Sequence, residues 1–270
     1  MDLAIFFQDY DYESSKQWLV SHEGFLLKSV AAYVIAIWSI KYIMSTKKPF
    51  DLTPPLIIWN AILAAFSIIG FVRMTPTVFE VVRSTYTEIG ALQTDKVAGY
   101  WAFLWVVSKI PEFLDTIFIV LRKKPLMFMH WYHHALTGYF AFVNFYEDNA
   151  YSMWVVYMNY FIHSFMYTYY CARALHIRIP PHFAQLLTGA QIVQFVITHV
   201  VMGHLLYLCA TTNKTYAVSA KGFAIGAFME VSYLLLWFRF YYISYIGGGG
   251  KKYLAHVKPG AAKNGAIKTD

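Results

Sequence analysis

Seven long runs of hydrophobic residues divide the chain, and short polar stretches separate them. Each run approaches the roughly 20 residues that a helix needs to cross the hydrocarbon core of a bilayer. The runs lack the alternation of polar and apolar residues over about ten positions that marks a membrane β-strand. We therefore expect an all-α integral membrane protein with seven transmembrane helices. The predicted spans are 25–44, 54–72, 97–121, 126–146, 151–172, 183–208 and 222–246.

These spans divide the chain into three segments. Residues 1–24 form a polar, acidic segment, 25–246 form the seven-helix transmembrane domain, and 247–270 form a flexible basic tail that begins with four glycines. Pro54 and Pro55 are expected to start the second span, because the first amides of a helix lack helical acceptors. Pro111 falls inside the third span and predicts a kink there.

Charge is distributed unevenly between the loops. Cytosolic loops of membrane proteins carry an excess of Lys and Arg. Alternate loops and the tail hold the basic residues Lys41, Lys47, Lys48, Arg122, Lys123, Lys124, Arg173, Arg178, Lys251, Lys252, Lys258, Lys263 and Lys268. The N-terminus is therefore expected on the lumenal side and the C-terminus in the cytosol. Asn213 begins a glycosylation sequon in a loop on the predicted lumenal side, and its glycosylation is left open.

Composition agrees with a membrane protein and narrows the possible partners. Hydrophobic residues make up 58% of the chain and charged residues only 14%, against about 25% charged in soluble domains. The net charge of +7 has a topological cause, so no nucleic acid partner is expected. Cys171 and Cys209 lie in apolar segments and provide neither a disulfide framework nor a metal-binding spacing.

Several polar residues interrupt four of the spans at a similar depth. Ionisable residues inside a membrane are candidates for function by default. The polar residues at this depth are Lys109, Glu112 and Asp115 along one helical face; His130, His133 and His134; Asn159, His163 and Tyr167; and Gln191 with Gln194. At a rise of 1.5 Å per residue, they lie roughly 10–16 Å from the cytosolic ends of their helices. They predict one intramembrane site open to the cytosol. His199 and His204 lie deeper and are expected to be on the lumenal side or structural.

The residues alone leave several interpretations open. Lys109 and Glu112 could be a purely structural ion pair, and the two glutamines could only join helices. The histidine triplet could bind metal as in membrane desaturases and hydroxylases, or supply a nucleophile to a thioester. A transporter gated by pH is a further alternative. Four histidines at one depth are few for a di-iron centre, which favours the nucleophile.

Four motifs in this order add a resemblance. "KIPEFLDT", "HWYHH", "NYFIHSFMYTYY" and "QIVQF" resemble the signature set of the ELO family, the very-long-chain fatty acid elongases of the endoplasmic reticulum. The resemblance covers nearly the whole chain. The tryptophan of "HWYHH" and the preceding "LMFM" are more similar to the type acting on saturated and monounsaturated chains.

The resemblance implies a 3-oxoacyl-CoA synthase. Acyl-CoA and malonyl-CoA would condense to 3-oxoacyl-CoA, with release of CO2 and CoA and with no cofactor and no metal. Six helices would form a barrel around an acyl tunnel, beside one N-terminal helix. Reductases and a dehydratase would be functional partners, and the sequence leaves open whether the protein forms a homodimer.

The resemblance also implies residue roles. His133 would accept the acyl group and His163 would face it across the site, while His130 and His134 would orient groups and relay protons. Lys109, Glu112 and Asp115 would form a supporting charged face. Hydrogen-bond donors to the thioester or enolate oxygen would be Asn159, Gln191 and Gln194. The candidates for binding the CoA phosphates are Lys123, Lys124, Arg173 and Arg178.

Overall fold

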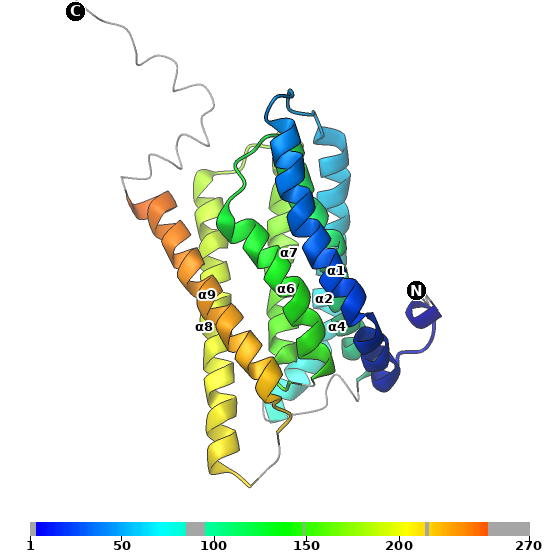
Figure 1. Cartoon of the computed structure of the whole chain (residues 1–270). Coiled ribbons are helices and arrows are strands. Elements are labelled where there is room, and N and C mark those ends of the chain that lie inside the picture. Colours follow the sequence, from blue (N-terminus) through cyan, green and yellow to red (C-terminus); the bar gives the residue numbers. More distant parts are fainter. Residues whose placement is uncertain (1–3, 85–94, 148, 214–215, 248–270) are drawn as a thin grey trace, which may run out of the picture.

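The computed structural model describes residues 4–84, 95–147, 149–213 and 216–247, and these residues are organised in helices (Figure 1). The tail beyond 247 and two positions of the sequon, Lys214 and Thr215, lie outside the described residues. The main helices are α1 (Tyr12–Met44), α2 (Thr53–Ser84), α4 (Lys96–Ser108), α5 (Leu114–Leu121), α6 (Phe128–Tyr146), α7 (Ser152–Ala174), α8 (Pro181–Thr211) and α9 (Ala220–Tyr241). Short helical turns are η1 (Ala4–Phe6), η2 (Pro111–Phe113) and η3 (Tyr242–Ile246).

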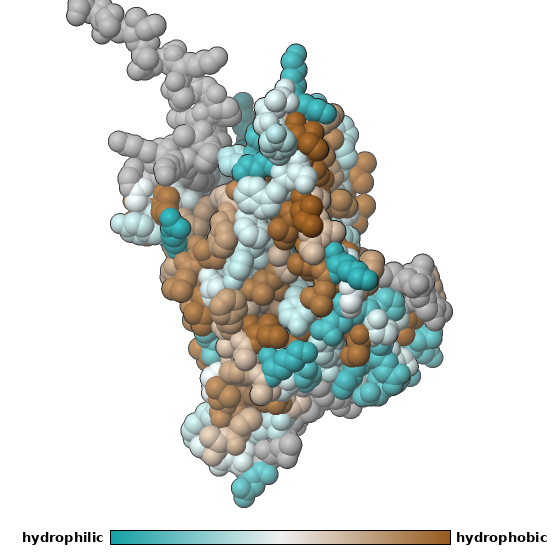
Figure 2. Space-filling model, viewed as in Figure 1, coloured by the Kyte–Doolittle hydropathy of each residue, from teal (hydrophilic) through white to brown (hydrophobic). Residues whose placement is uncertain are grey.

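Four helices of the described chain are long and apolar enough to cross a membrane. They are α1, α2, α8 and the stretch Ala220–Ile246 that contains α9. The other predicted spans coincide with α4 and α5 together, with α6, and with α7. The α4 and α5 helices are each too short to span a membrane alone, with 13 and 8 residues, whereas α6 and α7 are long enough but carry more polar residues. On the face shown in Figure 2, hydrophobic side chains cover the middle of the bundle and hydrophilic ones gather mainly toward its ends.

The first helix begins at Tyr12, well before the predicted start of the span at residue 25. Its N-cap is Asp11, whose side chain accepts a hydrogen bond of 2.8 Å from the backbone amide of Ser14. This cap satisfies one of the amides that a helix start leaves without a partner. A helix can therefore start in the polar segment, and the apolar run marks only its membrane part.

Pro111 divides the third predicted span, as the sequence indicates. The α4 helix ends at Ser108, Pro111 opens the turn η2, and α5 starts at Leu114. Proline cannot donate to the preceding turn, so the α-helical ladder stops there. Lys109, Glu112 and Asp115 therefore do not lie on one unbroken α-helix, but their charged groups remain close enough to interact.

The helix contacts run around the bundle. The α2 helix packs against α7 and α4, α7 packs against α8, α8 against α9, α9 against α6, and α6 against α4. The α1 helix packs against α6 and α5 (Figure 1). The contact of α2 with α7 is especially close at Gly70. A Cβ atom there would lie 2.6 Å from the ring of Tyr160.

Candidate intramembrane active site

The three histidines of α6 form one compact face. The helix begins directly after Met127 and places His130, His133 and His134 on adjacent turns. The ring centroids of His130 and His134 are 4.6 Å apart, and those of His133 and His134 are 5.4 Å apart. His134 is buried, and the buried Nε2 atom of His130 has no hydrogen-bond partner in the described part of the chain. One imidazole nitrogen of this face is thus buried without a partner among the described residues.

Two aromatic residues of α9 pack against the ring of His133. Its ring centroid is 4.9 Å from that of Tyr233 and 5.4 Å from that of Trp237. The Tyr233 hydroxyl donates to the backbone oxygen of His133 at 3.0 Å and pairs with the Thr137 hydroxyl at 2.8 Å. Sequence reasoning missed Tyr233 and Trp237. With 22 tyrosines and 8 tryptophans in the chain, nothing in the sequence separates them from packing aromatics.

Trp237 also connects this histidine face to α8. Its indole nitrogen donates to the Oε1 atom of Gln191 at 2.9 Å. The carbonyl of Gln191 is therefore occupied, and its NH₂ group remains as the donor, with only the sulfur of Met166 at 3.6 Å. Because a thioether is a weak acceptor, this NH₂ group is well suited to a stronger acceptor brought by a ligand.

His163 lies on α7 with its ring nitrogen fixed by Asn159. The distance from Nδ2 of Asn159 to Nε2 of His163 is 3.1 Å. The other end of Asn159, Oδ1, accepts from the indole of Trp105 at 2.7 Å and from Nζ of Lys109 at 3.4 Å. Since Oδ1 is the acceptor, Nδ2 donates to His163, and the proton of the neutral imidazole lies on Nδ1. The tautomer of His163 is thus set by Lys109 and Trp105 acting through Asn159.

Lys109 and Glu112 form an ion pair inside the protein. Their Nζ and Oε1 atoms are 2.7 Å apart, and both residues are 3% exposed. Ser108 donates a second hydrogen bond to the same carboxylate at 2.9 Å, and the ammonium lies 4.6 Å from the ring of Trp105. Partners on every side stabilise charges that would be costly alone at this depth.

Asp115 has its hydrogen-bond partners on two other helices. Its carboxylate accepts from the indole of Trp59 on α2 at 2.5 Å and from the hydroxyl of Tyr167 on α7 at 2.8 Å. Tyr167 in turn lies against His163, with ring centroids 5.2 Å apart. Asp115 therefore joins three helices, and Tyr167 connects it to His163.

His163 on α7 lies near the histidine face of α6. His163 lies within the electrostatic range of His133 and of Lys109, and His134 within that of His163. Gln194 is buried on α8. In the described part of the chain, no group of three His, Cys, Asp or Glu side chains has the arrangement of metal ligands. His199 and His204 lie further along α8, and Nδ1 of His199 pairs with the backbone oxygen of Phe195 at 2.7 Å.

The four predicted CoA-binding residues are exposed near one end of the bundle. Lys123 and Lys124 follow α5, Arg173 lies in the last turn of α7, and Arg178 precedes α8. Nζ of Lys123 donates to the backbone oxygens of Ser45 and Lys47 at 3.1 and 2.9 Å. Its ammonium therefore also holds two loops together, whereas Lys124, Arg173 and Arg178 extend the basic surface at this end.

A comparison of the sequence with models of known protein families gives a match that spans all of these residues. The family model described as ELO, GNS1/SUR4 family, matches residues 18–253, which include every residue of the candidate site. The chain belongs to the ELO family.

Relatives of this ELO-family chain carry consistent names. It is 40% identical over 249 residues to "Long chain fatty acid elongase 1" of Caenorhabditis elegans, covering 90% of this chain and 86% of the relative. It is 32% identical to "Very long chain fatty acid elongase 6" of Drosophila melanogaster, covering 96% and 84% of the two chains. It is 34% identical to "Very long chain fatty acid elongase 3" of Mus musculus, covering 93% of each.

Proposed function

We propose that this ELO-family protein condenses a long-chain acyl-CoA with malonyl-CoA, and that His133 carries the acyl group between the two steps. Fatty acid elongation is the function that the family and the names of the relatives support. The observation that carries the residue assignment is the face of three imidazoles near His163, with an amide side chain bonded to His163 and another bonded to Trp237, which packs on His133.

The architecture that we propose has seven spans. The contacts of α2, the α4–α5 pair, α6, α7, α8 and α9 follow one another around a closed circuit, with α1 against α6 and α5. This order supports a barrel of six helices around an acyl tunnel, with α1 beside it. We place the protein in the endoplasmic reticulum membrane with its N-terminus in the lumen and its basic end in the cytosol. Protease digestion of the tail in sealed microsomes tests this orientation.

In the first step, a ring nitrogen of His133 attacks the thioester carbonyl of the acyl-CoA. The C–N bond forms, the C–S bond breaks, and CoA leaves as a thiolate. The imidazole nucleophile is effective near neutral pH. His134 lies beside His133, and His130 lies beside His134; this pair takes up the proton of His133 and passes it to the thiolate.

In the second step, malonyl-CoA loses CO2, and the resulting enolate attacks the acyl carbon. The C–N bond to His133 breaks as the new C–C bond forms, and the leaving ring nitrogen takes up one proton from water through the neighbouring His134, so the neutral imidazole is regenerated. The NH₂ group of Gln191 and the Nδ1 proton of His163 are the donors positioned to stabilise the developing oxygen charge. Atoms and electrons balance without an oxidant, a reductant or a metal. Reductases and a dehydratase would then consume the 3-oxoacyl-CoA.

The proposal is tested by measuring incorporation of labelled malonyl-CoA into 3-oxoacyl-CoA by purified variants. His133→Ala is expected to abolish the product. His163→Ala is expected to lose about 10²–10⁴-fold, the usual contribution of a positioned acid or base. His199→Ala is the matched control, because its ring bonds to the backbone of its own helix, and it should retain activity. Full activity of His133→Ala, or loss of wild-type activity on removal of a bound metal by a chelator, would contradict the mechanism.

A further inference from the structure

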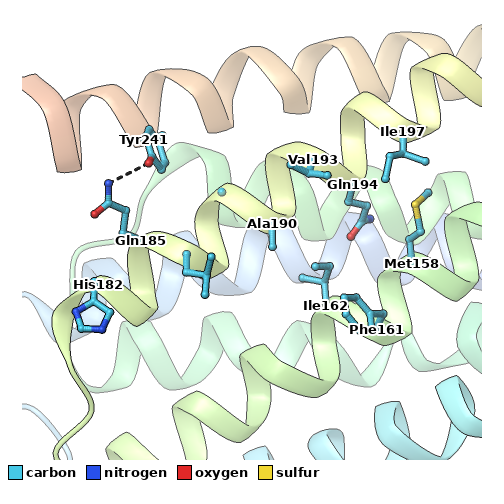
Figure 3. A pocket seen from close by; sticks show the side chains of 12 residues that line it. Met158, Phe161, Ile162, His182, Gln185, Ala190, Val193, Gln194, Ile197 and Tyr241 are labelled. Atoms are coloured by element: carbon cyan, nitrogen blue, oxygen red, sulfur yellow. Dashed lines mark hydrogen bonds between the residues drawn. The ribbon is translucent and has the colours of Figure 1, made fainter.

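A groove of about 730 Å³ runs between α7 and α8 (Figure 3). It is lined along α8 from His182 to Ile197, and along α7 by Met158, Phe161 and Ile162. At 1.5 Å per residue, the α8 side extends roughly 22 Å, most of the roughly 30 Å thickness of a bilayer core. The volume falls within the range of about 300–1,000 Å³ that is typical of small-molecule sites.

The outer edge of the groove is open to the side of the bundle. Phe161, Leu186 and Val193 line the groove and are exposed by 41%, 67% and 56%. The α8 helix is one of the four helices long and apolar enough to span a membrane, and when it does so, this exposed apolar edge meets the acyl chains of the bilayer. An apolar groove in this position is accessible from the lipid without passing through water.

Polar side chains of the groove have a defined order. His182 and Gln185 lie at the start of α8, where Gln185 donates to the hydroxyl of Tyr241 at 2.9 Å (Figure 3). This end lies beside the exposed basic residues Arg173 and Arg178. From there inward the lining is apolar up to Gln194. The order matches a ligand with a polar, anionic head and a long apolar tail.

The inner wall of the groove is shared with the candidate active site. Ile162 lines the groove and directly precedes His163. Gln194 lines it one turn after Gln191, which binds the indole of Trp237 against His133. A chain lying in the groove is therefore separated from the histidines only by side chains of α7 and α8.

We propose that this groove is a lateral entrance, through which the acyl chain of the substrate passes sideways from the bilayer into the bundle between α7 and α8. The inference rests on the proposed function, which makes a long-chain acyl-CoA the substrate. Moving each methylene group of such a chain from lipid into water costs free energy. A route between two helices keeps the chain in an apolar environment, whereas end-on threading from the cytosol does not.

Two glycines of α8 provide a matched test. Gly189 lines the groove and Gly203 lies further along the helix, and a Cβ at either position would meet nothing within 4 Å. Gly189→Trp fills the groove, while Gly203→Trp adds the same side chain elsewhere on the same helix. With long-chain acyl-CoA in vesicles, we expect the KM of Gly189→Trp to rise several-fold, with little change for a short-chain, water-soluble acyl-CoA. Gly203→Trp should match wild type with both substrates. Gly189→Leu and Gly203→Leu provide a smaller pair.

A second measurement does not depend on catalysis. In vesicles, acyl-CoA with a photoreactive group at the tail end is crosslinked to the wild type and to His133→Ala, and the labelled peptides are mapped. We expect label on residues 182–197 of α8 in both proteins, reduced by Gly189→Trp and displaced by unlabelled acyl-CoA. Three results would each overturn the proposed entrance. The two tryptophan variants could have equal kinetics, the groove could be labelled from phospholipid that acyl-CoA does not displace, or the crosslinks could join two copies of the chain. Failure of the proposed function would instead leave the wild type inactive while the crosslink persists.

Discussion

Residues of the candidate site act mainly through neighbours on other helices. Asn159 joins Lys109 and Trp105 to His163, and Gln191 joins α8 to Trp237. The sequence predicted the motif residues because a polar side chain inside an apolar run is conspicuous. It could not predict Trp59, Tyr233 or Trp237, because an aromatic residue in a membrane helix is unremarkable until its partner is known.

Variants of the buried ion pair distinguish a structural from a functional role of Lys109. Glu112→Gln leaves the Lys109 ammonium buried without its counter-charge, so we expect the stability of the protein to fall by about 3–5 kcal/mol. The double variant Lys109→Met, Glu112→Leu should recover most of this loss, because both charges are then removed. Thermal unfolding in detergent measures both changes.

Activity of the double variant then decides the role. We expect its condensation rate to remain well below wild type, because Asn159 loses the ammonium at 3.4 Å that helps to fix His163. Lys221→Met is the control. Lys221 pairs with Glu147 at 3.5 Å with its side chain 49% exposed, so its loss should cost less than about 1 kcal/mol. A stable double variant with full activity would make the ion pair purely structural.

At the scale of elements, prolines, caps and close contacts determine how the helices present the site. The sequence located each of the helices near its predicted span, and Pro111 correctly indicated a break. The direction of Asp115 after the break was not predictable, since it depends on Trp59 and Tyr167 from two other helices. The start of α1 at Tyr12 was also missed, because the cap at Asp11 lies outside the apolar run.

The contact of α2 with α7 gives a prediction about stability. The Tyr160 ring packs directly over Gly70, and its hydroxyl is held by the backbone oxygen of Trp101 at 2.9 Å. Gly70→Ala should therefore lower stability by about 1–3 kcal/mol through overpacking. Gly203→Ala has open space around the new methyl group and should instead raise it by about 0.5–1 kcal/mol. Equal unfolding midpoints of the two variants would show that α2 and α7 can separate freely at this point.

At the scale of the whole molecule, the packing order of the helices brings together motifs from distant parts of the sequence. The histidines of α6 meet α9, and α7 places His163 near them. Depth counted from helix ends indicated one polar layer, because depth depends only on the rise per residue. Which helices are neighbours around the bundle depends on tertiary packing, so the lateral groove between α7 and α8 could not be predicted.

The central claim is the covalent acyl group on His133. Purified protein is incubated with a labelled long-chain acyl-CoA in the absence of malonyl-CoA, and the trapped adduct is mapped by peptide mass spectrometry. We predict an acyl group on His133 that hydroxylamine releases, that malonyl-CoA converts to 3-oxoacyl-CoA, and that is absent in His133→Ala. An adduct of unchanged yield in His133→Ala, or wild-type condensation with no adduct under conditions that trap it, would contradict the account.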